Sequence, residues 1–432
     1  MKKTLITIAL VASTATLMAQ TFDLDAQVRP RFESKHGVKT LTPLNGVGSN
    51  FISQRTRLNF GYKNTKIKFG LTFQNVRVWG DVGTLSSRDL GNSFHQAWAE
   101  VKLAKKIALK LGRQEIVYDD SRIFGNAGWA QQARSHDAAI LKFKANDKHK
   151  VDFGLALNSD NQGGAKALYS NVAGYKSFQY IHYHGTVAKG LELSFLVLNT
   201  GVEYIKPIPT DSMNQQIDNM QTIGPRLTYK KGKFSANLAS YVQVGKLKNI
   251  DVNSLYVGAN IGYKFNKNWN VGAGVEYLSG KANNDTTIGI TSFNPVFGTN
   301  HKFNGCMDYF YVGNHGNNVG LMDINFTLAY SKNKFSAKVI PHLFSSAATI
   351  HDVANNKDLT ANLGTEIDVV LGYKIAKDIT MKAGFSMMLA SESMEYLKGT
   401  STQANNWTWV MFTFNPKLFS YTVAKKVVAK KL

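Results

Sequence analysis

Apolar and polar residues alternate along most of the chain, and this alternation predicts β-strands. From Thr21 to Arg31 the apolar side chains stand at even positions and the polar or charged ones at odd positions. The same period of two recurs over Thr56–Tyr62 and Ile67–Phe73. Such a period is typical of a strand with one apolar face, and few apolar residues recur at the helical spacing of i, i+3 and i+4. The pattern therefore predicts an all-β protein.

Tight polar turns and long polar loops alternate between these strands. The short turns lie near residues 63–64, 105–106, 146–148, 188–190, 231–232, 266–268, 331–333 and 376–378. The long loops run roughly over residues 34–50, 79–92, 118–135, 159–173, 203–218, 246–253, 281–318, 347–362 and 391–405. Outer-membrane barrels show this asymmetry, because their periplasmic turns are tight and their extracellular loops are long. Eight turns and nine loops join about 18 strands, which predicts a transmembrane antiparallel up-and-down β-barrel with both termini on one side.

A large soluble β-sandwich or β-helix is the alternative, but neither architecture requires short and long connections to alternate. Aromatic residues supply a second criterion, because many of them lie near the predicted strand ends. Trp79, Tyr118, Trp269 and Tyr330 are examples. The interface girdles of a membrane barrel place aromatic side chains at these positions, whereas a soluble core would place them in the middle of strands.

The first 20 residues have the pattern of a secretory signal peptide. Lys2 and Lys3 precede an apolar run over residues 5–17, and the run ends near Ala19. No later segment approaches the ~20 unbroken apolar residues of a membrane-spanning helix. We therefore predict a signal peptide over residues 1–20, a barrel over 21–419 and a basic tail over 420–432, in the outer membrane of a Gram-negative cell. This location implies outer-membrane lipid and the barrel assembly machinery as partners.

The formal net charge of +22 indicates an anionic partner. Export argues against nucleic acid as that partner and leaves an anionic solute or polysaccharide. The single cysteine, Cys306, excludes a disulfide scaffold and a cysteine-based zinc cluster. His182 and His184 share a strand face, but no third ligand is indicated, so we expect no metal site and no cofactor.

The sequence holds no GxSxG or HExxH motif. Residues 274–282 come nearest to a phosphate-binding loop, but they have one residue too many between the glycines and an alanine where Ser or Thr would hold magnesium. Asp119 and Asp120 are an acid–base candidate, although adjacent loop carboxylates more often pair with a cation such as Arg122. We predict no catalytic residues and no enzyme activity. Two other classes stay open: an outer-membrane lipid hydrolase with a Ser/His pair near the rim, and an adhesion or structural barrel with a closed lumen.

Arginine is concentrated in the first third of the chain, where nine of the ten arginines lie at or before residue 134. The period of two places Arg29, Arg31, Arg55 and Arg57 opposite the apolar faces, and therefore in the lumen of a barrel. A charge on the lipid face would cost roughly 2–4 kcal/mol at the membrane midplane. Guanidinium binds carboxylate through two parallel hydrogen bonds, which suits the passage of anions.

We therefore predict a set of arginines that line the pore and guide anions. They are Arg29, Arg31, Arg55, Arg57, Arg113, Arg122 and Arg134. In the alternative, the arginines brace the barrel wall by pairing with carboxylates of the interior. The carboxylates available for this are Asp23, Asp25, Glu33, Glu100 and Glu115.

The segment Leu111-Gly112-Arg113-Gln114, with its flanks, resembles the alginate export family of 18-stranded outer-membrane porins. The resemblance begins at residues 93–103 (SFHQAWAEVKL) and includes Asp119-Asp120, Trp129 and residues 136–143 (HDAAILKF). A second block, residues 293–314, resembles a loop of the same family. The resemblance implies a lumen lined by arginine and lysine that passes a polyanionic uronate polysaccharide. It also implies an inward Arg113, whereas alternation from Leu109 and Leu111 points Arg113 outward, so it requires a β-bulge near Gly112.

The longest loop, residues 281–318, contains many apolar residues and is therefore unsuited to full exposure. We predict that this loop folds into the mouth of the barrel as a constriction, with packing on the outer rim or on a partner as the alternatives. The sequence as a whole predicts a porin that gives passive, anion-selective passage to acidic solutes, such as an acidic polysaccharide of the alginate type.

Overall fold

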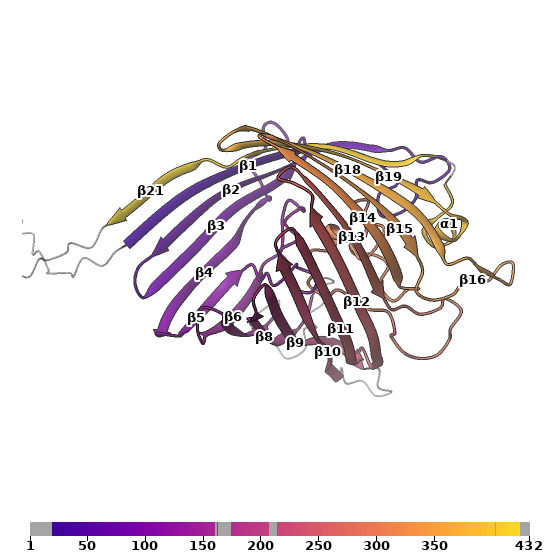
Figure 1. The fold of residues 1–432 in the computed structure, drawn as a ribbon, viewed down its shortest axis with the longest axis horizontal. Helices are drawn as coiled ribbons and strands as arrows, with labels where there is room; N and C mark the ends of the chain where they lie inside the picture. The colour runs from indigo at the N-terminus through magenta and orange to yellow at the C-terminus, as the bar shows by residue number, and fades with distance from the viewer. Residues whose placement is uncertain (1–19, 160–161, 163–173, 207–213, 402, 424–432) are drawn as a thin grey trace, which may run out of the picture.

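Antiparallel strands form a closed barrel in the computed structural model, which describes residues 20–159, 162, 174–206, 214–401 and 403–423. Each strand pairs with its neighbour in sequence, and the barrel closes where β1 pairs with the last strand of the wall (Figure 1). The wall has 18 strands, so the predicted fold class and strand number are confirmed.

The strands have the following bounds. They are β1 Gln20–His36, β2 Ser49–Lys63, β3 Ile67–Val78, β4 Asn92–Ala104, β5 Ile107–Gln114, β6 His136–Lys144, β7 His149–Leu157, β8 Ser177–Ala188, β9 Leu191–Lys206, β10 Asn214–Lys231, β11 Phe234–Leu247, β12 Ile250–Lys264, β13 Trp269–Leu278, β14 Leu321–Lys332, β15 Phe335–Ser345, β18 Asn362–Ala376, β19 Ile379–Ala390, β20 Asn405–Phe414 and β21 Lys417–Val423. Strands β20 and β21 occupy one position in the wall, because both pair with β1 on either side of Pro416. Proline lacks the N–H that a continuous ladder requires.

Tight turns lie at the end of the barrel where β21 ends, and longer loops lie at the other end with the hairpin β16 (Ile350–Asp352) and β17 (Lys357–Leu359) and the helix α1 (Glu392–Lys398). One predicted loop, over residues 246–253, is wrong. Strands β11 and β12 meet there in a turn at Lys248 and Asn249, with φ of 51° and 65°. Positive φ at both central residues fits a two-residue hairpin turn. Of the predicted loops at 159–173 and 203–218, most of the first and residues 207–213 of the second lie outside the described residues.

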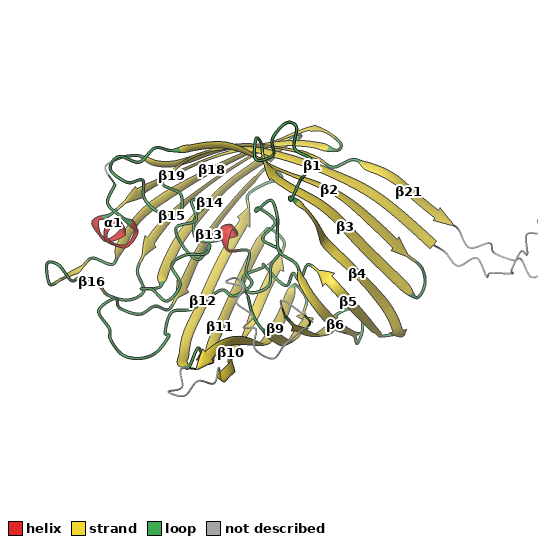
Figure 2. Ribbon diagram, turned by 180° about the vertical axis from the view of Figure 1, so that it is seen from behind, coloured by secondary structure: helices red, strands yellow, loops and turns green. Residues whose placement is uncertain are grey.

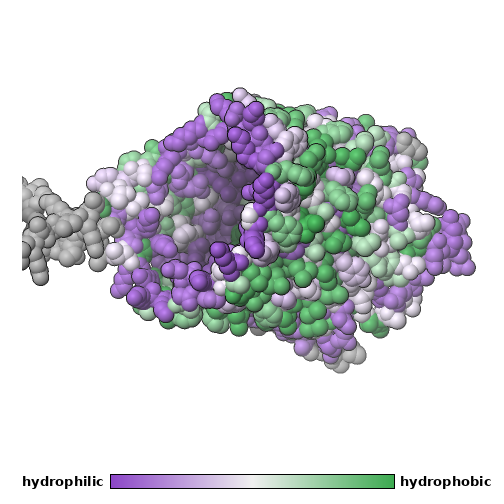
Figure 3. Space-filling view, viewed as in Figure 1, coloured by the Kyte–Doolittle hydropathy of each residue, from purple (hydrophilic) through white to green (hydrophobic). Residues whose placement is uncertain are grey.

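The outer face of the wall is apolar and the inner face is polar. On neighbouring strands Phe60 lies directly opposite Leu71, and Leu58 lies opposite Phe73. Figure 3 shows hydrophobic residues covering much of the outer wall. An apolar band of this kind faces lipid in outer-membrane barrels. No helix in the described part of the chain is long and apolar enough to cross a membrane.

The wall continues past the predicted boundary at residue 419. Strand β21 runs to Val423 and pairs with the beginning of β1, and the rings of Phe22 and Phe419 lie 6.0 Å apart. Residues 420–423, which the prediction assigned to the tail, are therefore part of the wall. Residues 424–432 lie outside the described residues, as do residues 1–19 of the predicted signal peptide, and Gln20 is already the first residue of β1.

Two loops fold into the barrel, residues 115–135 (the arginine-anchored loop) and residues 279–320 (the aromatic loop). Phe293, Tyr309 and Phe310 of the aromatic loop are buried. The two loops meet at a short parallel bridge between Phe124 and Phe297. Figure 2 shows the 3₁₀-helix of the aromatic loop, η1 (Asn300–Lys302), within the ring of strands. The predicted inward fold of this loop is confirmed.

Candidate functional site

Two cavities lie along the lumen, one toward the loop end and one toward the turn end. The first has a volume of about 570 Å³ and the second about 770 Å³. Both are lined in part by Trp129, His301 and Trp407, which come from the arginine-anchored loop, the aromatic loop and β20. These three side chains therefore stand between the two cavities. We call them, together with Trp409, the aromatic partition.

Trp129 is the central member of the aromatic partition, because other side chains surround its indole ring. The guanidinium carbon of Arg31 lies 4.1 Å from the ring centroid, and the His301 ring stacks on the indole with centroids 4.8 Å apart. Trp407 and Trp409 approach edge-on at 5.5 and 4.8 Å. Each such contact contributes on the order of 0.5–2 kcal/mol. The partition is therefore a packed cluster rather than a set of free side chains.

Arg29 anchors the arginine-anchored loop to β1. Its Nη1 donates to the carbonyl of Gly128 at 2.8 Å, and its Nη2 donates to the carbonyls of Trp129 and Ala130 at 3.0 and 3.2 Å. Nε and Nη2 also donate to Oε1 of Gln131 at 3.1 and 2.8 Å. Arg29 is 7% exposed. The fork geometry of guanidinium allows one side chain to hold four consecutive residues.

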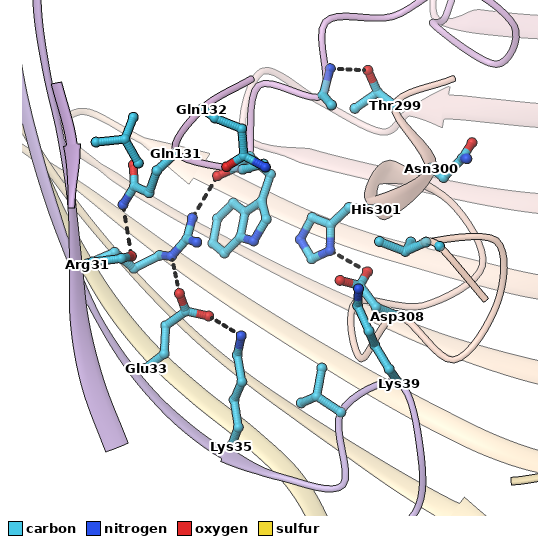
Figure 4. Close-up of a pocket in the computed structure, with 18 of the residues that line it drawn as sticks. Arg31, Glu33, Lys35, Lys39, Gln131, Gln132, Thr299, Asn300, His301 and Asp308 are labelled. Atoms are coloured by element: carbon cyan, nitrogen blue, oxygen red, sulfur yellow. Dashed lines mark hydrogen bonds and ion pairs between the residues drawn. The ribbon is translucent and has the colours of Figure 1, made fainter. Parts of the chain in front are cut away.

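Arg31 and Arg55 continue this anchoring on β1 and β2. Arg31 donates from Nη1 to the carbonyl of Trp129 at 2.8 Å and from Nε to Glu33 at 2.8 Å (Figure 4). Arg55 donates to the side chain of Gln27 at 2.7 Å and lies beside the same loop. Both arginines are 5% exposed. The lumen position predicted for these side chains is therefore found, but much of their hydrogen-bonding capacity is used by the protein itself.

Arg57 holds the arginine-anchored loop through an intermediate side chain. Its Nε donates to Gln74 at 2.9 Å, and Gln74 in turn donates to the carbonyl of Gln132 at 3.1 Å. Glu115 lies 3.9 Å from its Nη1. Of the five carboxylates considered as bracing partners, Glu33 and Glu115 thus pair with predicted arginines.

The far side of the arginine-anchored loop is held by its two adjacent carboxylates. Asp119 accepts hydrogen bonds from Nε2 of His182 at 3.1 Å and from Oγ of Ser194 at 2.6 Å. Asp120 pairs with Arg226 of β10 at 2.6 Å. Burial raises the pKa of Asp119, but the hydrogen bonds and the charge of its partners lower that pKa further, so the net shift is downward. The loop therefore crosses the lumen from β1 to β8, β9 and β10.

Arg122 and Arg134 join the arginine-anchored loop to the rest of the interior. Arg122 is 1% exposed and pairs with Glu276 of β13 at 2.6 Å, and it also donates to Asn304 of the aromatic loop at 3.0 Å. Arg134 donates to the carbonyl of Gly298 at 2.8 Å. Breaking a buried ion pair by removing one partner typically costs about 3–5 kcal/mol. These two predicted residues therefore connect the inward loops.

The inward aim predicted for Arg113 is wrong. The pairing of β5 with β4 runs without a shift through Gly112, so no bulge redirects the chain there. Arg113 lies directly opposite Asp137 on β6 and pairs with it at 2.7 Å, and both side chains are exposed on the outer face. Gly112 has φ of +111°, and a Cβ there would lie 2.3 Å from the Ala97 carbonyl. Glycine is required at this position for the close approach of β4, not for a bulge.

Lysines form a second cationic set, which the predicted set of pore-lining residues does not contain. They point inward by alternation and lie in the half of the barrel near the tight turns. They are Lys63, Lys68, Lys102, Lys110, Lys142, Lys144, Lys150, Lys230, Lys264, Lys338, Lys374 and Lys382. Figure 3 shows a hollow lined by hydrophilic residues at the end where β21 lies. We call these side chains the lysine funnel; the period of two, applied to each strand, would have identified them.

Ser194 has a hydroxyl within hydrogen-bond distance of a histidine and is therefore a candidate nucleophile. It donates to Asp119 at 2.6 Å, and Nδ1 of His184 lies 3.0 Å from the same oxygen. The serine proton therefore points to the carboxylate and not to a histidine base, which is not the arrangement of an activated nucleophile. Within the described residues, no three His, Cys, Asp or Glu side chains are placed to hold a metal ion.

Comparison with known proteins adds a family and a fold. The family model described as Alginate export matches residues 20–399. No curated protein matches the chain. Solved structures with the same fold include Pseudomonas aeruginosa OccK8 (OprE), at TM-score 0.59 and 11% identity, covering 92% of this chain and 98% of that one. OccK2 (OpdF) of the same organism in complex with glucuronate has TM-score 0.58 and 11% identity, covering 92% and 97%. OpdK of the same organism with vanillate has TM-score 0.57 and 12% identity, covering 93% and 98%.

Proposed function

Because the chain belongs to the alginate export family, we propose that it gives passive, anion-selective passage to acidic solutes. The chain is a porin-like barrel of the outer membrane. The proposal concerns the selectivity of this channel and the class of its solute.

The observation that carries the proposal is the excess of cationic side chains inside the barrel. The lysine funnel has twelve members on the inner face of the turn half. The carboxylates on the inner face of the same half number five and are Asp23, Asp25, Glu100, Asp152 and Glu192. A ring of cationic groups in a water-filled pore raises the local concentration of anions and sets anion selectivity. We therefore assign selectivity mainly to lysines, because several arginines are engaged in holding the arginine-anchored loop.

Both cavities next to the aromatic partition also contain more cationic than anionic side chains. The cavity at the loop end has Arg31, Lys35, Lys39, Arg77 and Arg134 against Glu33, Asp81 and Asp308, several of which are shown in Figure 4. The cavity at the turn end has Arg29, Arg226, Lys302, Lys338 and Lys382 against Asp120, Glu276, Asp323 and Asp368. Glu276 and Asp120 are already paired with arginines. The positive charge therefore extends along the whole path.

Acidic sugars are the solute class that we propose. Volumes of about 570 and 770 Å³ fall in the range of small-ligand sites. Each cavity therefore suits a solute of one or two sugar rings. A longer acidic polymer such as alginate would pass only if the two inward loops moved apart. Glucuronate in OccK2 and vanillate in OpdK are both carboxylates, which is in keeping with a carboxylate solute for this fold.

The test is the reversal potential of the purified protein in planar bilayers under a KCl gradient. Wild type should prefer chloride to potassium. The double variant Lys338→Gln/Lys382→Gln, which removes two charges from the turn-end cavity, should shift the reversal potential toward zero. The control Lys248→Gln/Lys357→Gln removes two charges from the loop-end surface and should leave it unchanged. Cation selectivity of wild type, or equal shifts in both variants, would contradict the proposal.

A further inference from the structure

A separate pocket lies at the turn end of the barrel, where β3, β4, β5 and β6 meet their turns. Its volume is about 350 Å³, and none of its lining residues lines either cavity of the aromatic partition. Seven of its lining residues are lysines, and no arginine is among them. The lysines are Lys66, Lys68, Lys102, Lys105, Lys106, Lys142 and Lys144. We call this the lysine pocket.

Most of the charge in the lysine pocket has no carboxylate counterpart. Glu100 is the acidic residue of the lining, and its two oxygens pair with Lys68 and Lys142, each at 2.7 Å. Lys144 pairs with Asp147 at 2.7 Å. The other four members of the pocket have no ion pair with a carboxylate in the part of the chain that the structure describes. They are Lys66, Lys102, Lys105 and Lys106.

Backbone hydrogen bonds hold the lysine-bearing turns side by side. The amide of Lys102 donates to the carbonyl of Lys66 at 2.8 Å, and the amide of Lys144 donates to the carbonyl of Lys106 at 2.9 Å. Asn64 accepts from the amides of Lys66 and Ile67 at 2.8 and 2.7 Å, which fixes the first turn. These hydrogen bonds fix the backbone of the turns that carry the four lysines. The turns therefore cannot move apart to reduce the repulsion between the ammonium groups.

We propose that the lysine pocket is an anion site for phosphate-bearing ligands at the turn-end mouth of the lumen, where it shares four lysines with the lysine funnel. An ammonium group acts as a compact point charge and binds phosphate without the planar match that favours arginine for carboxylate. Several unpaired ammonium groups around one concavity favour an anion of charge two or more over chloride. The tight turns place the pocket on the periplasmic side. The phosphate belongs either to a soluble phosphorylated compound or to the headgroup of an anionic lipid in the inner leaflet.

The experiment is calorimetric titration of the full-length protein in detergent with inorganic pyrophosphate. The variant Lys66→Gln/Lys105→Gln/Lys106→Gln removes three unpaired charges from the pocket. Because each exposed charge contact is modest, the three together should weaken binding by about tenfold or more. The control is Lys189→Gln/Lys267→Gln/Lys377→Gln, which removes three lysines from other turns at the same end and should weaken binding less than twofold. No binding to wild type, or equal weakening in both variants, would overturn the proposal.

The source of the phosphate follows from the same titration in lipid nanodiscs. If the headgroup is the ligand, phosphatidylglycerol should lower the affinity of wild type for pyrophosphate relative to phosphatidylcholine alone, and the pocket variant should lose this difference. If a soluble compound is the ligand, the two lipid compositions should give the same affinity in wild type. Either result is consistent with a phosphate site in the lysine pocket. The reversal potential of the same variants is measured separately. It tests the proposed channel selectivity, whereas the titration tests the phosphate site, so the failure of one proposal can be distinguished from the failure of the other.

Discussion

Replacing Arg29 with lysine separates the two roles open to the lumen arginines, because lysine keeps the charge and loses the geometry. Arg29 makes five contacts with residues 128–131, the closest at 2.8 Å. A single ammonium group has three N–H donors at one point and cannot reproduce the fork. At least two of the contacts are therefore lost.

The size of the effect follows from the burial of this side chain. Arg29 is 7% exposed, so solvent screens its hydrogen bonds little. Losing two or three partly compensated bonds to a charged donor weakens the docking of the arginine-anchored loop by about 2–4 kcal/mol. Since 1.4 kcal/mol is tenfold, the population with the loop detached rises by about 30- to 700-fold.

Two measurements detect a detached loop. Single-channel recordings of Arg29→Lys should show larger current fluctuations than wild type, with the reversal potential unchanged because the charge is kept. Limited trypsin digestion should cleave the variant faster after Arg122, which is 1% exposed while the loop is docked. Arg29→Gln is the matched variant that loses both charge and fork, and it should also shift the reversal potential. Wild-type noise and wild-type protease resistance in Arg29→Lys would refute the anchoring role.

Three further outcomes are expected. Trp129→Ala removes the ring between the two cavities and should raise the single-channel conductance; unchanged conductance would mean that the aromatic partition does not limit flow. The pKa of Asp119 lies below its ordinary value of 3.8, because hydrogen bonds from partners such as His182 outweigh the effect of burial. The ionised Asp119 therefore stabilises the docked loop above pH 3.8. This stabilisation is lost as the pH falls through the lower pKa that Asp119 has in the folded protein. Channel noise should therefore rise as the pH is lowered below 3.8, and Asp119→Asn should be noisy already at pH 6. Arg113→Gln should leave the reversal potential unchanged, because Arg113 faces outward beside Asp137; a shift would return it to the conduction path.

Properties that depend only on residues adjacent in the chain, such as the face on which a side chain lies, could be predicted from the sequence. A strand turns alternate side chains to opposite faces, so the period of two places Arg29 and Arg55 in the lumen without knowledge of any contact. The same rule gave the correct face for Arg113, and the resemblance to a family motif gave the wrong one. It also places the lysine funnel in the lumen, although the predicted set of pore-lining residues contained only arginines.

Contacts between distant segments could not be derived in this way. Nothing near Arg29 in sequence indicates that its partners are carbonyls about a hundred positions away, at Gly128 and Trp129. The polar residues 246–253 have the composition of a long loop, yet positive φ at Lys248 and Asn249 closes a turn there.

The sequence by itself determined an 18-stranded barrel with a polar inner face, because alternation and turn length are set by the local backbone. Only the tertiary structure decided which inward side chains remain available to a solute. Closure of the barrel brings β1, β8 and β13 around residues 115–135, and the arginines and carboxylates that meet there bond to the loop rather than to water. The physical reason is that buried charged groups and carbonyls must find partners within the protein.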